Sequence, residues 1–210
     1  MELLDKRKQQ SKPTLVQQGI SIGMDYEKYR DLVHHLAETE QTTGHVQTEA
    51  NVHYTQLNDR RMKRWHKTFA IPDEVQQRII KIKSRLTFLT ITESWCGDAA
   101  HSMPVFSKIA ELNPNIDHKV VLRDEVPDIM DAFLTNEARS IPKVILWDGE
   151  SKEIVGDWGP RPLAATEMVE AYKKEHGKLT PEFKQDLQVW YNKDKGRGIL
   201  REVLNLLPLK

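Results

Sequence analysis

The feature that most constrains the fold is a junction between a short apolar run and a helical pattern, with the chain's only cysteine at the joint. Leu86–Thr92 is rich in β-branched and aromatic residues and predicts a strand. Trp95-Cys96-Gly97 follows, and residues 96–112 predict a helix that Asn113-Pro114 ends. Cys96 is therefore expected at the first turn of a helix. Free N–H groups and the positive end of the helix dipole stabilise a thiolate there and lower the pKa of the thiol.

The hydrophobic pattern after this junction predicts the other elements of an α/β sheet. Further strands are expected at residues 119–122, 143–147 and 153–155, and further helices at 127–134, 162–176, 180–190 and 199–207. Asp148-Gly149 is typical of a hairpin turn between the last two strands. The order strand, helix, strand, helix, hairpin, helix predicts a mixed sheet with a parallel and an antiparallel half, flanked by helices.

The segment before this sheet predicts a helical extension. Residues 1–24 are polar and interrupted by proline and glycine, and we interpret them as an irregular arm. Helices are expected from residue 25, from about 47 to 65, and from Ile71-Pro72 onward. Because each helix has an apolar stripe, we expect all three to pack on the sheet domain. The side chains expected to be buried in this way include Tyr54, Leu57, Ile79 and Ile80.

Three features of residues 86–158 together resemble the thioredoxin family. They are Trp95-Cys96-Gly97 between a strand and a helix, Pro104 eight residues after the cysteine, and Ile141-Pro142 just before the apolar run Val144–Trp147. The resemblance implies a thioredoxin-like domain at residues 85–176, preceded by an arm and helical extension at 1–84 and followed by packed helices at 177–210. It also implies a cis Ile141-Pro142 peptide bond opposite an exposed or half-exposed thiol, although a trans bond is the default for proline.

Three positions depart from the family pattern. Ala99 stands where a dithiol enzyme has its second cysteine, so a two-cysteine exchange cycle is impossible within this chain. Thr90 stands where related proteins keep a buried aspartate that handles protons. Asp98 lies two residues from the sulfur, and its charge would raise the thiol pKa, although an acid is also favourable at a helix N-terminus.

These observations lead to competing hypotheses of function. The first is a single-cysteine thiol–disulfide oxidoreductase in cell redox homeostasis, which forms mixed disulfides that an external thiol releases. The second is a catalytically inactive module that binds an extended peptide or protein, and a third is a sensor whose cysteine is oxidised to sulfenic acid. The pKa of Cys96 separates them, because a value at or above that of a free cysteine favours the second hypothesis. The predicted site consists of Cys96 as the catalytic residue and Trp95, Gly97, Asp98, Ile141 and Pro142 as the substrate-binding residues.

Composition narrows the range of partners. The 31 basic residues balance 31 acidic ones, so no overall charge attracts nucleic acid or an anionic membrane. The basic run Arg60–Arg64 is interpreted as a solvated helix face.

The histidines have no metal-ligand spacing, and His101 is rotated by about 140° from Cys96 on a helix, so we expect neither a metal, nor a cofactor, nor a Cys–His dyad. The charged start lacks a signal-peptide pattern and the single cysteine suits a reducing compartment, so we expect a cytoplasmic protein whose partner is a protein or a small thiol or disulfide. The oligomeric state is left open.

Overall fold

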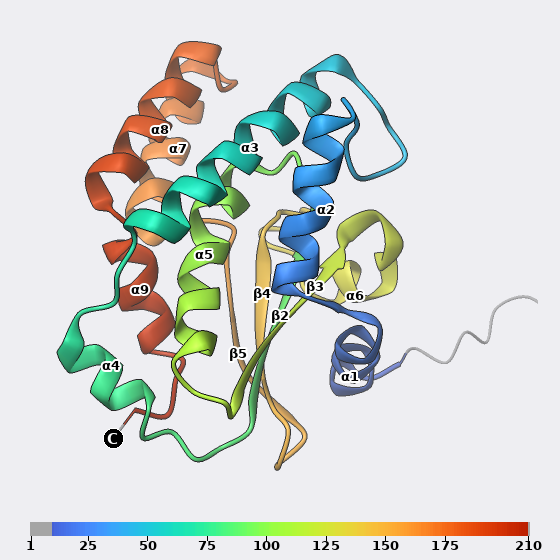
Figure 1. Cartoon of the computed structure of the whole chain (residues 1–210). Coiled ribbons are helices and arrows are strands. Elements are labelled where there is room, and N and C mark those ends of the chain that lie inside the picture. Colours follow the sequence, from blue (N-terminus) through green and yellow to red (C-terminus); the bar gives the residue numbers. More distant parts are fainter. Residues whose placement is uncertain (1–9, 210) are drawn as a thin grey trace, which may run out of the picture.

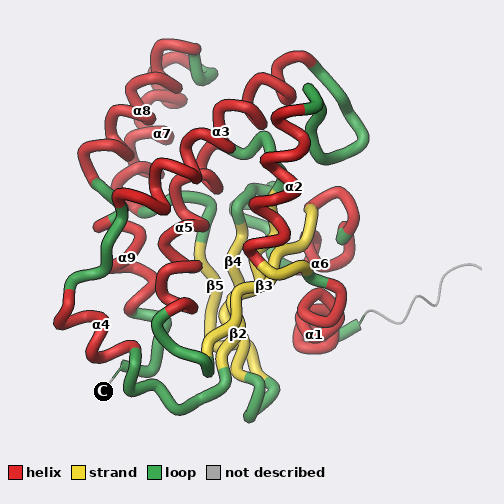
Figure 2. The backbone as a smooth tube through the Cα atoms, in the orientation of Figure 1, coloured by secondary structure: helices red, strands yellow, loops and turns green. Residues whose placement is uncertain are grey.

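The computed structural model describes residues 10–209 and contains a five-stranded mixed sheet (Figures 1 and 2). The strand order is β1-β3-β2-β4-β5, with β2 at the centre. β3 runs parallel to β2, whereas β4 is antiparallel to both β2 and β5. The strands are β1 (Met24–Asp25), β2 (Leu86–Thr92), β3 (Ile116–Leu122), β4 (Lys143–Asp148) and β5 (Glu153–Trp158). The predicted mixed α/β fold, with a parallel and an antiparallel half, is confirmed.

Helices cover both faces of the sheet (Figure 1). One face carries α3 (Glu49–Thr68), α4 (Asp73–Ile79), α5 (Gly97–Glu111), α7 (Leu163–His176), α8 (Pro181–Asp194) and α9 (Arg197–Leu204). The other face carries α1 (Lys12–Ile22) and α6 (Pro127–Ala132), which follows the 3-10 turn Arg123–Glu125. α2 (Tyr26–Glu38) packs against α3 and β3. The helical extension therefore lies on the sheet domain.

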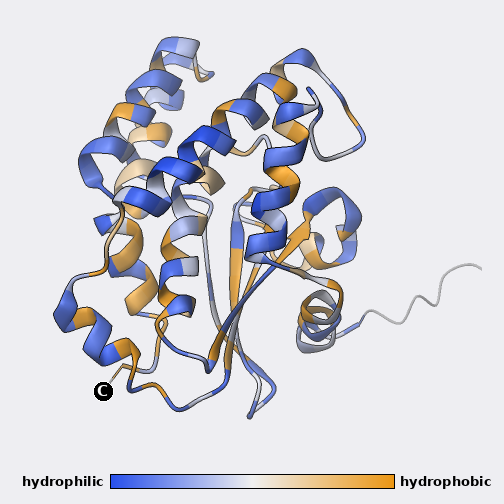
Figure 3. Cartoon of the chain, in the orientation of Figure 1, coloured by the Kyte–Doolittle hydropathy of each residue, from blue (hydrophilic) through white to orange (hydrophobic). Residues whose placement is uncertain are grey.

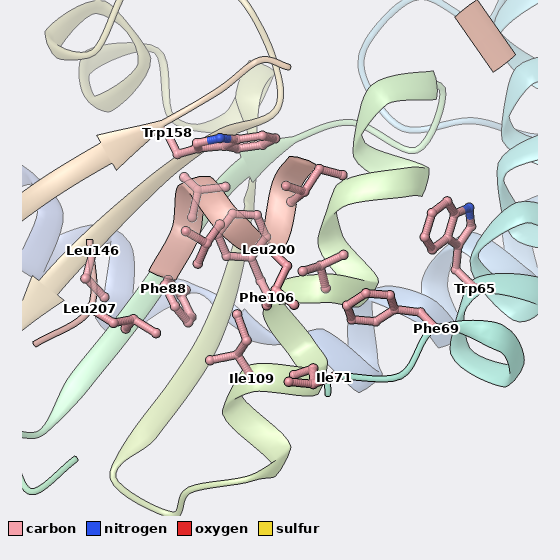
Figure 4. Close-up of a cluster of buried hydrophobic side chains, with 14 of the residues drawn as sticks. Trp65, Phe69, Ile71, Phe88, Phe106, Ile109, Leu146, Trp158, Leu200 and Leu207 are labelled. Atoms are coloured by element: carbon pink, nitrogen blue, oxygen red, sulfur yellow. The ribbon is translucent and has the colours of Figure 1, made fainter. Parts of the chain in front are cut away.

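Two hydrophobic clusters make up the core. The first packs α4, α7, α8, α9 and the later turns of α5 on the sheet, whereas the second includes α1, α6, α2 and the first turns of α5. Alternate residues of β2 divide between them, with Phe88 in one cluster and Leu89 and Ile91 in the other. Figure 4 shows the first cluster, in which the Phe106 ring of α5 packs on Phe88 and on Trp158, with ring centroids 5.1 and 5.4 Å apart. The outer helices are mostly hydrophilic, while the central strands are hydrophobic (Figure 3). Both faces of the central strand are buried, and this explains its continuous apolar sequence.

The N-terminal segment is helical where the sequence predicted an irregular arm, so that prediction is wrong for residues 12–22. The Ser11 hydroxyl accepts a hydrogen bond from the Thr14 N–H at 3.4 Å, and a proline occupies the first turn. Leu15 and Val16 are buried in the cluster under α6. Gly19 is not a helix breaker here, since a Cβ at this position would lie 2.8 Å from the Leu89 side chain. Residues 1–9 of the predicted arm lie outside the described part of the chain.

The buried face of α3 differs from the predicted apolar stripe. Thr55, Asn58, Asp59, Met62 and Trp65 are buried, whereas Tyr54 and Leu57 are only partly covered. Thr55 and Asn58 tolerate burial because hydrogen bonds to other segments satisfy them, as described below, and Asp59 pairs with Lys63 at 2.9 Å. In α4 and the turn that follows, Ile79 is fully buried, but Ile80 is 48% exposed and contradicts the prediction.

Candidate active-site loop and cleft

Cys96 lies at the start of α5, as predicted, but its sulfur is buried. Cys96 is the N-cap residue of the helix and is 7% exposed. Its Sγ–H donates a hydrogen bond to the Ile141 carbonyl oxygen at 3.3 Å. The Ile141-Pro142 peptide bond is cis, as predicted. The prediction of an exposed or half-exposed thiol is wrong, because the Ile141 carbonyl and the surrounding side chains cover the sulfur.

The surroundings of Cys96 stabilise the thiol form. Burial, and to a smaller extent the charge of Asp98, raise the pKa of Cys96 to about 12. The N–H groups of Ala99 and Asp98 and the charge of Arg161 lower the pKa, but they do not offset burial. The expected effect of the helix N-terminus is therefore present but outweighed by desolvation. The expected effect of Asp98 has the predicted sign.

Asp98 is bound by two residues from the C-terminal part of the chain. Arg161 Nη2 lies 2.7 Å from Asp98 Oδ2, and the Tyr191 hydroxyl donates to Asp98 Oδ1 at 2.8 Å. Burial raises the pKa of Asp98, and Arg161 and Tyr191 oppose that rise. Gly159, with φ of +120°, lets the loop carrying Arg161 approach Pro142, because a Cβ there would overlap the Pro142 carbonyl. Sequence reasoning missed Arg161 and Tyr191, since nothing in their local patterns shows that they reach Asp98.

A cleft of about 770 Å³ opens beside this loop. Five of the six predicted site residues line the cleft, namely Trp95, Cys96, Gly97, Asp98 and Ile141. The sixth, Pro142, packs its carbonyl against Gly159 instead. Residues of α3 form one wall, and residues of α8 and of the segment just before it form another. The wall residues are Glu49, Ala50, Asn51, His53, Tyr54, Leu57 and Arg61 from α3, Leu179, Pro181, Lys184, Gln185, Leu187 and Gln188 from the α8 side, and Arg161. Tyr54 and Leu57 thus face the cleft rather than the core.

His101 does not face Cys96, in agreement with the helical spacing, and it joins three helices. Trp65 Nε1 donates to His101 Nδ1 at 2.8 Å, and His101 Nε2 lies 2.8 Å from Gln188 Oε1. Because tryptophan only donates, Nδ1 is an acceptor and the proton is on Nε2. Burial lowers the pKa of His101 to about 3, and its ring stacks on Tyr191. This neutral imidazole connects α3, α5 and α8 below the cleft and has a structural role.

A buried network of hydroxyl groups holds the loop before Cys96. Ser94 Oγ lies 2.8 Å from Thr55 Oγ1 and 3.1 Å from Thr42 Oγ1, and it accepts from the Thr43 N–H at 3.0 Å. Asn58 Nδ2 donates to the Ser94 carbonyl at 2.8 Å. The network ties the α2–α3 loop and α3 to the junction between β2 and α5. Sequence reasoning missed it because its members come from three separate segments.

At position 90, where the resemblance implies a buried aspartate, this chain has a threonine that contacts a histidine. Thr90 Oγ1 lies 2.9 Å from His118 Nε2, and burial lowers the pKa of His118 to about 3. The nearest buried acid in sequence is Glu93, whose Oε1 accepts from the Asp124 N–H at 3.0 Å. Burial raises the pKa of Glu93, and Oε2 has no hydrogen-bond partner within residues 10–209. Neither Thr90 nor its neutral histidine partner can act as the proton-handling carboxylate.

Within the described residues, no three histidine, cysteine, aspartate or glutamate side chains form a group that could hold a metal ion. In the same part of the chain, the helices are too short or too polar to span a bilayer.

Comparison with known proteins agrees with this fold. A thioredoxin family model matches residues 44–173, well over half of the chain. No curated protein matches the chain. Two similar crystal structures are a protein of unknown function from Pseudomonas aeruginosa (TM-score 0.61) and an HIV epitope-scaffold (TM-score 0.60). Each is 19% identical, and the alignment covers 90% of this chain and 95% of the other, so these likenesses show the fold alone. The chain is therefore a member of the thioredoxin family.

Proposed function

We propose that this chain is a thioredoxin-fold binding module that holds a segment of a partner protein in the cleft beside Cys96. One observation carries the proposal. The only thiol is 7% exposed and donates its proton to the Ile141 carbonyl, in a site that lacks a second sulfur. The role of Trp95 and its neighbours is then recognition, and Cys96 is part of the cleft surface.

The thiol environment favours binding over exchange. Thiol–disulfide exchange begins with attack by a thiolate. A pKa of about 12 leaves a thiolate fraction at pH 8 on the order of a thousandfold smaller than that of a free cysteine. Ala99 provides no sulfur to release a mixed disulfide. Both the first step and the resolving step are therefore disfavoured at this site.

The cleft has the properties of a ligand site. Its volume of about 770 Å³ lies within the range of small-molecule and peptide-segment pockets. Leu57, Leu179 and Leu187 provide apolar surface, and Trp95 lies at the loop that closes it. The Trp95 ring is itself held by Arg123, whose guanidinium lies 4.9 Å from the ring centroid.

The single-cysteine oxidoreductase is the competing hypothesis, and one observation favours it. Cys96 does line the cleft, so a bound disulfide could contact the sulfur. In that reaction the Cys96 thiolate attacks the disulfide, forms a new S–S bond and releases the other sulfur as a thiolate. An external thiol would then break the mixed disulfide.

Two measurements on the full chain separate these functions. The first is the pH dependence of iodoacetamide alkylation of Cys96, for which the binding module predicts an apparent pKa well above about 8.5. The second is binding of cysteine-free, N-acetylated and C-amidated hexapeptide mixtures carrying a neutral fluorophore, measured by fluorescence anisotropy. Cys96→Ser should bind these mixtures as the natural chain does, and Ala99→Cys should gain no insulin reductase activity.

The opposite results would overturn the proposal. They are an alkylation pKa below that of a free cysteine, reductase activity in Ala99→Cys, or a failure of the natural chain to bind any peptide mixture.

A further inference from the structure

We propose that the cleft selects a partner segment with an acidic side chain, and that Arg61 binds this carboxylate. The inference rests on the proposed binding function and names the class of its ligand. The occupant is an extended, partly apolar peptide segment whose carboxylate lies between α3 and the Trp95-Cys96-Gly97 loop. The argument uses the charges of the cleft, the way in which Arg61 is held, and its surroundings.

The charges in the cleft do not balance. Three cationic side chains line it, Arg61, Arg161 and Lys184, together with two acids, Asp98 and Glu49. Asp98 is engaged by Arg161 at 2.7 Å. Within residues 10–209, neither Arg61 nor Lys184 lies within 4 Å of a carboxylate. Glu49, exposed in the first turn of α3, is the one remaining acid, so a bound anion complements the cleft.

Arg61 is held in place by a neutral partner that leaves its charge available. Its Nη1 donates to Asn58 Oδ1 at 3.0 Å, and Asn58 Nδ2 donates to the Ser94 carbonyl. A Cβ on Gly97 would lie 3.5 Å from Arg61 Nη1, so the guanidinium lies against the Trp95-Cys96-Gly97 loop. A guanidinium has five N–H donors in a planar fork, which suits a two-point contact with a carboxylate. Because Asn58 already orders the side chain, binding loses less conformational entropy.

Partial burial removes water from the Arg61 guanidinium, so its charge is destabilised when no ligand is bound. Desolvation is the main reason that the pKa of Arg61 is lowered to about 10; Arg64 and Arg60 add to this effect, and Tyr54 and the charge of Asp98 oppose it without cancelling it. A carboxylate beside the guanidinium would compensate this cost, which a neutral ligand would not. The side chains of Tyr54 and Leu57 on the same wall provide apolar contact for the residues flanking the acid. Lys184, whose Nζ lies 5.8 Å from the centre of the Tyr54 ring, adds positive charge across the cleft.

The test compares two fluorescent hexapeptide mixtures that differ at one position. Both are cysteine-free, N-acetylated and C-amidated, with flanking positions drawn from alanine, leucine, valine and phenylalanine. The central residue is glutamate in one mixture and glutamine in the other. We expect the glutamate mixture to bind the full chain about tenfold or more tightly at low salt, and the preference to shrink as salt is raised.

Variants assign the preference to Arg61. Arg61→Gln should abolish it and Arg61→Lys should retain part of it, while Arg60→Gln, an exposed neighbour outside the cleft, should leave it unchanged. Thermal melts by circular dichroism establish that each variant is folded. Equal binding of both mixtures by the natural chain, or an unchanged preference in a folded Arg61→Gln, overturns this inference and leaves the binding function standing. Binding of neither mixture overturns both.

Discussion

Replacing Ser94 by alanine tests whether the buried hydroxyl network holds the loop before Cys96. Ser94 is 2% exposed, and its hydroxyl has four polar partners between 2.8 and 3.2 Å. Not all of these partners are stranded by the substitution. Thr42 Oγ1 and Thr55 Oγ1 remain 2.8 Å apart and can bond to each other, and the residue 94 N–H still reaches Thr43 Oγ1 at 2.8 Å. The group left without a partner is the backbone N–H of Thr43.

The expected loss of stability follows from the number of buried groups that lose their partner, which is one. A buried donor that loses its partner costs about 1–3 kcal/mol, and the remaining hydroxyl bonds add a few tenths. We therefore expect Ser94→Ala to lower the free energy of unfolding by about 2 kcal/mol and Tm by about 4–8 °C for a chain of this size. Urea unfolding followed by circular dichroism measures the change. Ser151→Ala, in the exposed turn between β4 and β5, is the matched control and should change stability by less than about 0.5 kcal/mol. A loss for Ser94→Ala no larger than that of the control would show that the network does not stabilise the loop.

Two predictions concern the free energy of unfolding as a function of pH. Acidification lowers the contribution of His118, whereas it relieves the cost of ionising Glu93. The pKa of His118 is lowered to about 3, so its contribution to stability is fully present above the unfolded value near 6.5 and is lost as pH falls toward 3, by about 1.4 kcal/mol per pH unit. Urea unfolding between pH 7 and 4.5 should therefore show a shallower acid-side loss for His118→Gln than for the natural chain, and equal slopes would contradict this reasoning. The pKa of Glu93 is raised, so its ionisation costs stability as pH rises above the unfolded value near 4.3. The unfolding free energy of Glu93→Gln, relative to that of the natural chain, should therefore increase from pH 4.5 to 7, and a decrease over that range would refute the assignment.

The local part of the fold could be predicted from the sequence because its signals are local. The strand Leu86–Thr92, the helix that begins after Cys96 and the Ile141-Pro142 turn each depend on a few adjacent residues. The α1 helix also has a local signal, the capping residue Ser11, but the polar composition of the segment led to the wrong prediction of an irregular arm. Fold class and loop position were therefore accessible without coordinates.

The chemistry of the site could be predicted less well from the sequence, because it depends on segments that are far apart in the chain. Burial of Cys96 requires the Ile141 carbonyl, and the charge of Asp98 is shared with Arg161 and Tyr191, more than 60 residues away in the chain. The helix N-terminus lowers the thiol pKa as expected, but only tertiary packing reveals that desolvation exceeds that effect. Arg61 was interpreted as part of a solvated basic face, whereas its side chain lines the cleft. A residue's solvent exposure, unlike its helical register, is set by the whole molecule.

The cleft is assembled from two parts of the chain that need not evolve together. The family-matched segment ends at residue 173, but the wall formed by α8 begins at Pro181. α8 is anchored by its buried face, which includes Phe183 and Leu187, while Lys184 and Gln185 face outward at the cleft. Substitutions at the exposed residues of α8 would therefore change the ligand preference and leave the sheet and the cysteine loop intact. The structural requirement is only that the buried face of α8 still fits the sheet domain, so the ligand preference can change without a change of fold.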